Sequence, residues 1–310
     1  MEAFIKFYRF KVYWNALKKI LSSEKELIVM IIDNPGLLKT VDYYARKEGV
    51  RSRIKILFFI HGYHYFMPPN ELENFYGMID DLIVLTRASY HFQLTQTHAL
   101  PCEVTHIYNG VDSIKFQHVS ASDKTILRQT LGLSENKIYL LWLSQDRSKK
   151  GLHIILKAWE KLIQDLPNIE LLIIGTHNEI HGKQIRWLGR IPNDQLASYY
   201  QASDIYLFST LCHEGHPMSL TEALKCGNVC IASNIDPVAE IMGTGSFGRL
   251  VDFPNMPQNW VKAISDELKK YENNSRINTY RKNIPDKIYD LEEWCKNIEK
   301  LVEKWKKRTL

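Results

Sequence analysis

The stretch "HEGHPMSLTEALKCG", residues 213–227, holds two histidines, two glutamates, one proline and two glycines. Its histidines stand as H-E-G-H, one position closer than in the H-E-x-x-H zinc signature. Gly215 and Pro217 would also interrupt the helix that this signature requires, so a metal site is not expected. Ser219 and Glu222 fit a capping box, in which each side chain accepts the backbone N–H of the other residue. Glu214 has no comparable structural explanation.

Glu214 comes just after the apolar segment "DIYLFST", residues 204–210, which predicts a buried strand. Doubly wound α/β folds place their ligands beyond the carboxyl ends of the strands. The N–H groups at the start of the following helix suit a phosphate. The stretch therefore predicts a site in which Glu214 and Glu222 hold hydroxyl-bearing groups on either side of a diphosphate.

Working outward from this stretch, short apolar segments alternate with helical ones along the chain. Buried strands are predicted at 27–32, 54–60, 82–86, 103–108, 137–144, 169–175, 185–189, 204–210 and 229–233, with helices at 4–23, 37–49, 71–81, 88–100, 149–167, 192–203, 219–227 and 291–308. Continuous apolar strands separated by helices are typical of a parallel sheet covered on both faces. The pattern restarts after a polar segment, so two α/β halves joined near residues 115–125 are expected.

Composition fits a globular protein of two domains, with 310 residues of which 45% are apolar. The five cysteines are scattered and never spaced C-x-x-C, which argues against a disulfide framework or a zinc ribbon and favours a reducing, cytosolic setting. No apolar run approaches the ~18 residues of a membrane span, so a soluble protein is expected.

The charge of the chain is concentrated at its two ends. Residues 1–20 carry five Lys/Arg and one Glu, and residues 296–310 carry six Lys/Arg and two Glu, so each end has a net charge of +4 within a total of +5. Basic ends predict peripheral contact with anionic lipid, although charged helix faces exposed to water explain them as well. Nucleic-acid binding is not expected, because the basic residues are confined to the ends.

Glu214 and Glu222 stand eight positions apart, and "EGHPMSLTEALKCGNVCIAS" resembles the E-x7-E segment of the retaining GT-B glycosyltransferases, most closely glycosyltransferase family 4. Four other segments resemble this family in the same order: "IYNGVD", "KKGLHIILKAW", "GRIPNDQLASYYQASDIYLFST" and "DLEEWCKNIEKLVEKW". The resemblance covers residues 27–305. It implies an α/β fold of two Rossmann-like, doubly wound domains facing a cleft, with a shortened acceptor-side domain at 1–117, a donor domain at 118–285 and a C-terminal helix at 286–310 that packs back on the first domain.

The resemblance also implies roles for individual residues. Glu214 would bind the hydroxyls of the transferred sugar, Glu222 the nucleotide ribose, and Lys150 the leaving diphosphate. Residues expected around the sugar and diphosphate are Gly215, His216, Met218, Ser219 and Leu220, with Arg190 and Ile191 near the base. His61, after the strand 54–60, matches the histidine that faces the reacting sugar, although His61 and His64 are also explained as hydrogen-bonded residues at a strand end. No metal or other cofactor is expected, because Lys150 and a helix N-terminus can stabilise the leaving phosphate.

The sequence departs from the family pattern in two places. Gln145 stands where the family has an arginine, and Arg147, two residues later, is the expected replacement. In the family, a strand and a Gly-rich loop precede the strand that residues 27–32 resemble, whereas here that strand is the first one predicted. The resemblance therefore predicts a first domain without the usual Gly-rich loop.

The sequence therefore predicts a retaining glycosyltransferase of hexosyltransferase type. It would move a sugar from a nucleoside-diphosphate sugar to a glycan or lipid-linked acceptor in the synthesis of a cell-surface polysaccharide such as lipopolysaccharide. The expected location is the cytoplasm, at the inner face of the membrane. The alternative is a donor-binding subunit or inactive relative that needs a partner chain for acceptor binding; a phosphorylase has less support, because no segment resembles one with a cofactor-bearing lysine.

Overall fold

The computed structural model describes residues 2–63, 67–97 and 100–309, so His64 lies outside the described residues. The chain forms two compact units: unit 1 comprises Met1–Asn109 and Glu292–Leu310, and unit 2 comprises Gly110–Leu291. The sequence placed these junctions at 117/118 and 285/286. The observed junctions differ because the two connecting segments bind each other inside unit 2, where Val111 N donates to Tyr289 O (2.8 Å) and Leu291 N donates to Val111 O (3.0 Å).

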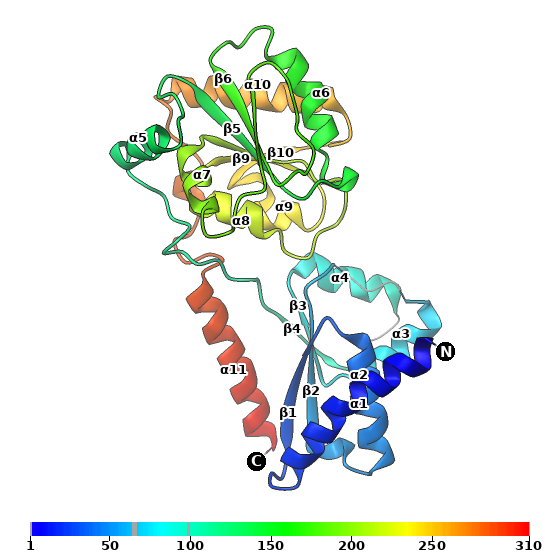
Figure 1. Ribbon diagram of the computed structural model, residues 1–310. Helices are drawn as coiled ribbons and strands as arrows, with labels where there is room; N and C mark the ends of the chain where they lie inside the picture. The colour runs from blue at the N-terminus through cyan, green and yellow to red at the C-terminus, as the bar shows by residue number, and fades with distance from the viewer. Residues whose placement is uncertain (1, 64–66, 98–99, 310) are drawn as a thin grey trace. The chain divides into compact units, whose positions relative to one another are not determined.

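Unit 1 is built on a four-stranded parallel sheet with the order β1-β2-β3-β4. Its strands are β1 (Leu27–Ile32), β2 (Ile54–Ile60), β3 (Asp81–Val84) and β4 (Glu103–His106), and its helices are α1 (Glu2–Leu21), α2 (Pro35–Lys47), α3 (Pro69–Tyr76), α4 (Arg87–Gln96) and α11 (Leu291–Thr309) (Figure 1). A helix connects each strand to the next, because parallel neighbours require a crossover. The four strands predicted before residue 110 are confirmed.

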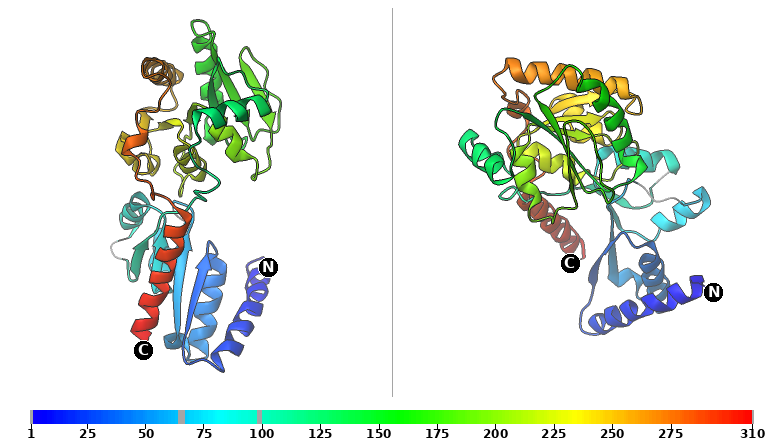
Figure 2. Two further views of the ribbon diagram at one scale, coloured as in Figure 1. Left: turned by 90° about the vertical axis from the view of Figure 1, so that its left-hand side faces the viewer. Right: turned by 45° about the horizontal axis from the view of Figure 1, so that its top comes forward.

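Strand β2 shows how both faces of this sheet are covered, since successive side chains of a strand point to opposite faces. Ile56 and Phe58 belong to a buried cluster with side chains of α1 and α2. Leu57 and Phe59 belong to a second cluster, which includes Trp305 of α11. Figure 2 shows α1 and α2 on one side of the strands and α11 on the other.

A buried carboxylate fixes α11 to this sheet. Asp81, at the start of β3, has no exposed surface, and its Oδ2 accepts hydrogen bonds from Trp305 Nε1 (2.9 Å) and Lys304 Nζ (3.1 Å). Thr105 Oγ1 donates to the same oxygen at 3.0 Å. The amphipathic pattern of the last helix is therefore explained by its packing on the sheet of unit 1, whose strands lie far from α11 in the sequence.

Unit 2 contains a six-stranded parallel sheet with the order β10-β9-β8-β5-β6-β7. Its strands are β5 (Ile138–Leu143), β6 (Ile169–Ile174), β7 (Ile185–Gly189), β8 (Ile205–Phe208), β9 (Val229–Ser233) and β10 (Gly248–Val251), and its helices are α5 (Ala121–Thr130), α6 (Leu152–Leu162), α7 (Leu196–Ala202), α8 (Met218–Lys225), α9 (Val238–Ile241) and α10 (Pro257–Asn273). Short 3-10 turns lie at Arg51–Arg53, Ser148–Lys150, Gly243–Gly245 and Arg281–Asn283. A buried cluster joins β5 to α6 and α10 and includes Trp142, Trp159 and Trp260.

Helix α5 lies where the sequence analysis expected a connecting segment. It begins after Ser120, whose hydroxyl accepts the backbone N–H of Asp123 at 3.1 Å. A serine three positions before an acidic residue is a helix-start signal, which the polar character of 116–125 obscured. Within the described residues, no helix is both long and apolar enough to cross a bilayer.

Replacing Trp305 by Ala should lower the free energy of unfolding by about 3–5 kcal/mol, as expected for truncation of a large buried aromatic. It removes the packing on Leu57 and Phe59 and the hydrogen bond to Asp81. Urea unfolding and limited proteolysis of α11 measure the effect. Lys300→Ala, on the exposed side of the same helix, is the control; an equal loss in both variants would contradict this account of α11.

Candidate functional site

The candidate site lies at the carboxyl ends of β5 and β8, which are neighbours at the centre of the sheet of unit 2. The chain runs from β5 outward on one side through β6 and returns to the other side through β8, so this is the point at which the strand order reverses. Ligands of doubly wound sheets bind at such a crevice. A cavity of about 520 Å³ opens there, lined by Leu143, Ser144, Gln145, Arg147, Lys149, Lys150, Ile174, Gly175, Arg190, Ile191, Leu196, Phe208, Glu214, His216, Pro217, Met218 and Ser219.

The loop after β5 is held against the end of β8 by its backbone. Leu211 N donates to Lys149 O (2.7 Å), and Ser209 Oγ donates to Lys150 O (2.9 Å). Gly151 has a φ of 73°, and a β-carbon there would overlap with the carbonyl oxygen of Ser209. The glycine of the "KKG" segment is thus required by the close approach of two backbones, and this approach carries Lys150 to the cavity.

Lys150 and Glu214 form an ion pair inside the cavity, with Lys150 Nζ 2.7 Å from Glu214 Oε1. Their side chains are 18% and 17% exposed, so the pair is mostly shielded from water. Thr210 Oγ1 donates to the same carboxylate oxygen at 2.7 Å, and the Cys212 thiol lies 4.0 Å from it. Two residues that are 64 positions apart are therefore held at hydrogen-bond distance by the fold.

The other oxygen of Glu214, Oε2, receives no hydrogen bond from the residues that the structure describes. It is available to a hydroxyl group in the cavity, while Oε1 holds the side chain in place. The titratable lining consists of four Lys/Arg (Arg147, Lys149, Lys150 and Arg190), one carboxylate (Glu214) and His216, giving +4 − 1 = +3 with the histidine neutral. This excess of positive charge suits an anionic ligand such as a diphosphate.

Helix α8 starts two residues earlier than the capping box requires, so the prediction that Ser219 caps it is wrong. Its N-cap is Pro217, which makes no side-chain hydrogen bond, so Ser219 already lies in the first turn. Leu220 N and Thr221 N both donate to Pro217 O at 3.1 Å. Within the described residues the N–H groups of Met218 and Ser219 have no acceptor, which leaves the positive end of α8 open at the cavity.

Glu222 is bound to Tyr200 rather than to the start of its own helix. Its Oε2 accepts the Tyr200 hydroxyl at 2.9 Å. Burial raises the pKa of Glu222 to about 7, while the hydrogen bond from Tyr200 and the charge of Lys115 act in the opposite direction. The carboxyl group is consequently close to half-protonated near neutral pH.

The structure brings most of the predicted donor residues of unit 2 to this one cavity: Arg147, Lys150, Arg190, Ile191, Glu214, His216, Met218 and Ser219. Gly215, Leu220 and Glu222 are not among its lining residues. Leu220 is fully buried, and its N–H is already bonded to Pro217. The lining also includes Lys149 and Gly175, which the sequence did not predict as site residues. Gly175 could have been found, because it ends the predicted strand 169–175, and ligands bind at the carboxyl ends of such strands.

His61 belongs to unit 1, where it follows β2. Its backbone N–H donates to Asp33 Oδ1 at 2.9 Å, and its Nδ1 lies 3.3 Å from Asp33 Oδ2. Asp33 follows β1 and has a φ of 49°. The two side chains therefore form a polar pair at the carboxyl ends of β1 and β2, with the imidazole about a third exposed.

Solved structures share this architecture. The chain aligns with a UDP complex of Anabaena HepE at a TM-score of 0.72 and 18% identity, over 89% of this chain and 78% of that one. It aligns with the sucrose-phosphate synthase of Thermosynechococcus elongatus at a TM-score of 0.75 and 16% identity, over 96% and 78%. Two parallel α/β sheets of this kind define the fold class: it is that of the GT-B glycosyltransferases.

The sequence profile described as "Glycosyl transferases group 1" matches residues 123–284, more than half of the chain. The chain therefore belongs to the group 1 glycosyl transferases. Among curated relatives, the phosphatidyl-myo-inositol mannosyltransferase of Mycolicibacterium smegmatis is 28% identical over 165 residues, which are 50% of this chain and 41% of that protein. The N-acetyl-alpha-D-glucosaminyl L-malate synthase of Bacillus anthracis is 26% identical over 72% of this chain and 62% of its own length. Matched regions thus span about half of these relatives.

Glu222 should make the stability of the chain depend on pH. Because its pKa is raised from 4.5 to about 7 in the folded state, its protonated form stabilises the fold below its ordinary pKa, and this contribution is lost as the pH rises through 7. Glu222→Gln, which stays neutral, should gain up to about 3 kcal/mol over the wild type between pH 5 and pH 8. Urea unfolding at several pH values measures this, with Glu160→Gln as an exposed control. Parallel pH profiles for wild type and Glu222→Gln would refute the assignment.

Proposed function

We propose that this protein is a retaining glycosyltransferase that uses a nucleoside-diphosphate sugar as donor and a glycan or lipid-linked acceptor in cell-surface polysaccharide synthesis. The observation that carries the proposal is the Lys150–Glu214 ion pair, which lines the same cavity as the N-terminal end of α8. It combines one cation for a leaving phosphate with one free carboxylate oxygen for a sugar hydroxyl. No metal ion or other cofactor has a part in the proposed reaction.

The leaving diphosphate determines which groups the reaction needs. Breaking its bond to the anomeric carbon leaves negative charge on the phosphate oxygen, and preorganised cations and N–H donors lower the energy of that state. Lys150 and Arg147 line the cavity with the open N–H groups of Met218 and Ser219. These groups can stabilise the departing phosphate together, because they come from the ends of neighbouring elements.

Retention of configuration follows if the acceptor attacks the face from which the diphosphate departs. The acceptor oxygen bonds to the anomeric carbon, the bond from that carbon to the diphosphate oxygen breaks, and the acceptor proton passes to the departing phosphate oxygen. This route requires no nucleophile from the protein. Glu214 holds the sugar by its hydroxyls, Glu222 holds the ribose, and His61 is assigned to the acceptor side of the reacting sugar.

Relatives support the choice of substrates. Anabaena HepE has been crystallised with UDP and with UDP-glucose, which are donor-type ligands. The mycobacterial relative is named as a mannosyltransferase of phosphatidyl-myo-inositol, a lipid acceptor. Arg190 and Ile191, at the end of β7, are then assigned to the nucleotide base.

Glu214→Ala should lower kcat/KM for sugar transfer by at least about 100-fold, since both the hydroxyl ligand and the partner that positions Lys150 are lost. Transfer of radiolabelled sugar from a panel of nucleoside-diphosphate sugars to membrane extracts measures it. Glu160→Ala, an exposed change on α6, should retain full activity. Circular dichroism must show both variants folded, and unchanged transfer by Glu214→Ala would overturn the proposal.

The same assay separates the second candidate function, a donor-binding subunit that needs a partner chain. This candidate is favoured by the matched regions, which cover only 41% of the mycobacterial relative. It requires the purified chain to bind the donor without transferring sugar. Robust transfer by the chain alone would dismiss it.

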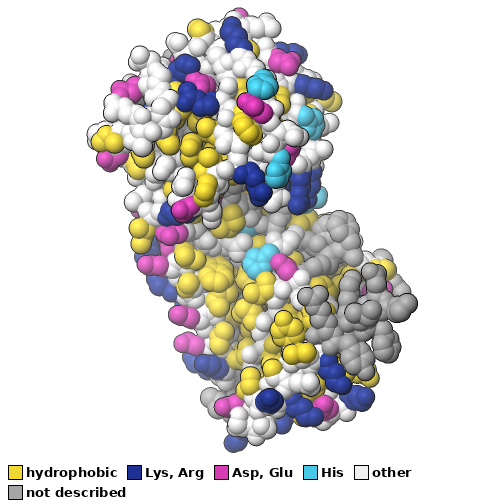
Figure 3. All heavy atoms as spheres, in the orientation of Figure 1, with side chains coloured by type: hydrophobic (Ala, Val, Ile, Leu, Met, Phe, Trp, Pro, Cys, Tyr) yellow, Lys and Arg dark blue, Asp and Glu magenta, His cyan; other side chains and the backbone are white. Residues whose placement is uncertain are grey.

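The proposed location is the inner face of the membrane, reached through the basic ends of unit 1. Val12 and Tyr13 of α1 are 69% and 56% exposed, and α11 ends in the exposed residues Lys306, Lys307 and Arg308. Figure 3 shows dark blue Lys and Arg side chains next to yellow hydrophobic ones at the lower end of unit 1. Helix α1 itself carries the exposed Lys18 and Lys19, and helices with exposed apolar groups and cations are typical of surfaces that bind anionic lipid.

Replacing Lys306 and Lys307 by Gln should weaken binding to phosphatidylglycerol vesicles by about tenfold or more, because each cation near an anionic surface contributes roughly 1 kcal/mol. Sedimentation with vesicles at several salt concentrations measures this. Lys157→Gln with Lys161→Gln, an equal charge change on α6, should leave binding unchanged. Binding to neutral vesicles at the same strength would contradict the electrostatic mechanism.

A further inference from the structure

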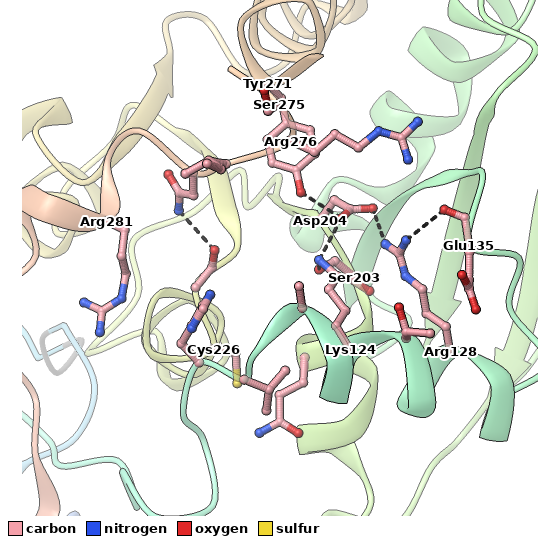
Figure 4. Close-up of a pocket in the computed structure, with 18 residues that line it drawn as sticks. Lys124, Arg128, Glu135, Ser203, Asp204, Cys226, Tyr271, Ser275, Arg276 and Arg281 are labelled. Atoms are coloured by element: carbon pink, nitrogen blue, oxygen red, sulfur yellow. Dashed lines mark hydrogen bonds and ion pairs between the residues drawn. The ribbon is translucent and has the colours of Figure 1, made fainter. Parts of the chain in front are cut away.

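A second cavity lies in unit 2 at the opposite ends of the strands, outside the proposed donor site. It has a volume of about 580 Å³ (Figure 4). Its lining comes from the segment before β8, the start of α5 and the segments at the C-terminal ends of α8 and α10. The proposed reaction uses none of its lining residues. Four Lys/Arg (Lys124, Arg128, Arg276 and Arg281) and two carboxylates (Glu135 and Asp204) supply its charged side chains, and His118, Tyr271 and Cys226 are its other titratable groups.

Asp204 forms ion pairs with two of these cations. It is 4% exposed, and its carboxylate lies 2.7 Å from Lys124 Nζ and 2.6 Å from Arg128 Nη2. Tyr271 OH and the backbone N–H of Tyr139 also donate to it, at 2.9 and 2.8 Å. This cluster is fully bonded and belongs to the fold, which leaves no capacity in Asp204 for the remaining cations.

Arg276 and Arg281 are not neutralised. Arg276 makes one hydrogen bond, from Nη2 to Asn136 O at 3.3 Å, and the Arg281 guanidinium has neither an ion pair nor a hydrogen bond within the described residues. Glu135, the other carboxylate, accepts Gln129 Nε2 at 2.8 Å. The lining therefore has a charge of +4 − 2 = +2 with His118 neutral, and Arg276 and Arg281 are its two cations without an ion pair within the described residues.

The field of these cations is felt by His118, whose pKa is lowered first by burial and then by the charges of Arg281 and Lys124. Ser275 and Arg276 also adopt consecutive left-handed conformations, with φ of 55° and 61°. Non-glycine residues seldom adopt such values, and here they place the Arg276 side chain at the cavity. Figure 4 shows Arg281 on one side of the cavity and Arg276 on the other, next to the Asp204 cluster.

We propose that this cavity binds a small soluble metabolite that carries two phosphate groups. Arginine presents a planar fork of donors that matches phosphate oxygens in bidentate geometry. Two unpaired arginines on opposite sides of one cavity suit a ligand with an anionic group at each end better than a single compact anion. The start of α5 adds the positive end of a helix on the same wall.

Fructose 1,6-bisphosphate is a suitable probe, titrated into the full chain by calorimetry, with uncharged fructose as the matched ligand. Arg276→Gln and Arg281→Gln should each weaken its binding at least tenfold, and the double variant should abolish it. Lys262→Gln, an exposed change of equal charge on α10, should leave binding intact. Both arginines lie outside the Asp204 cluster, so these variants are expected to remain folded, which circular dichroism checks.

Three results would overturn the proposal: no binding of the bisphosphate by the wild-type chain, binding unchanged in the double variant, or binding lost in Arg147→Gln/Lys150→Gln instead, which would place the probe in the donor cavity. Sedimentation with phosphatidylglycerol vesicles distinguishes a lipid headgroup as the phosphate source. Loss of vesicle binding in the Arg276/Arg281 double variant without bisphosphate binding would reject the soluble ligand. The sugar-transfer assay is independent, so its failure leaves this test intact.

Discussion

The pairing of β5 with β8 is the constraint on which the site of unit 2 depends. These strands are far apart in sequence, yet Leu140 and Ile205 are partners in the sheet. Because the chain reverses its direction of travel across the sheet at this pair, the loops beyond both strands meet over one crevice. Gly151 lets the first loop approach the backbone at Ser209, and Lys150 consequently reaches Glu214.

The geometry of Glu214 explains how one residue can be both fixed and available. One carboxylate oxygen is held by Lys150 and Thr210, and the other is open to the cavity. A carboxylate without such support would lose more conformational freedom on binding a ligand. The start of α8 has no side-chain cap. The backbone N–H groups there that make no hydrogen bond within the described residues are therefore available for an anion.

Sequence patterns predicted nine of the ten strands that the structure describes, because strands such as β2, β5 and β6 are short apolar runs whose residues are almost all buried. Strand β10, which contains the exposed Arg249, was not predicted. Helix α5 was missed since its exposed, polar surface looks like a connecting segment, although Ser120 caps it. The capping box failed for a tertiary reason: Tyr200, from another helix, binds the Glu222 carboxyl group. The sequence showed the spacing of Glu214 and Glu222, but Lys150 and Tyr200, which bind them, come from other parts of the chain.

The sequence by itself determined the α/β fold, the family and the segments that line the cavity at the ends of β5 and β8, because periodicity and motif order are local properties. Only the tertiary structure decided which groups touch: Lys150 with Glu214, Glu222 with Tyr200, and α11 with Asp81. It also revealed the cavity with Arg276 and Arg281, whose lining comes from segments between residues 118 and 281. Such contacts join residues that are far apart along the chain. Which charged groups form ion pairs and which do not is therefore decided only when the folded sheet brings them together.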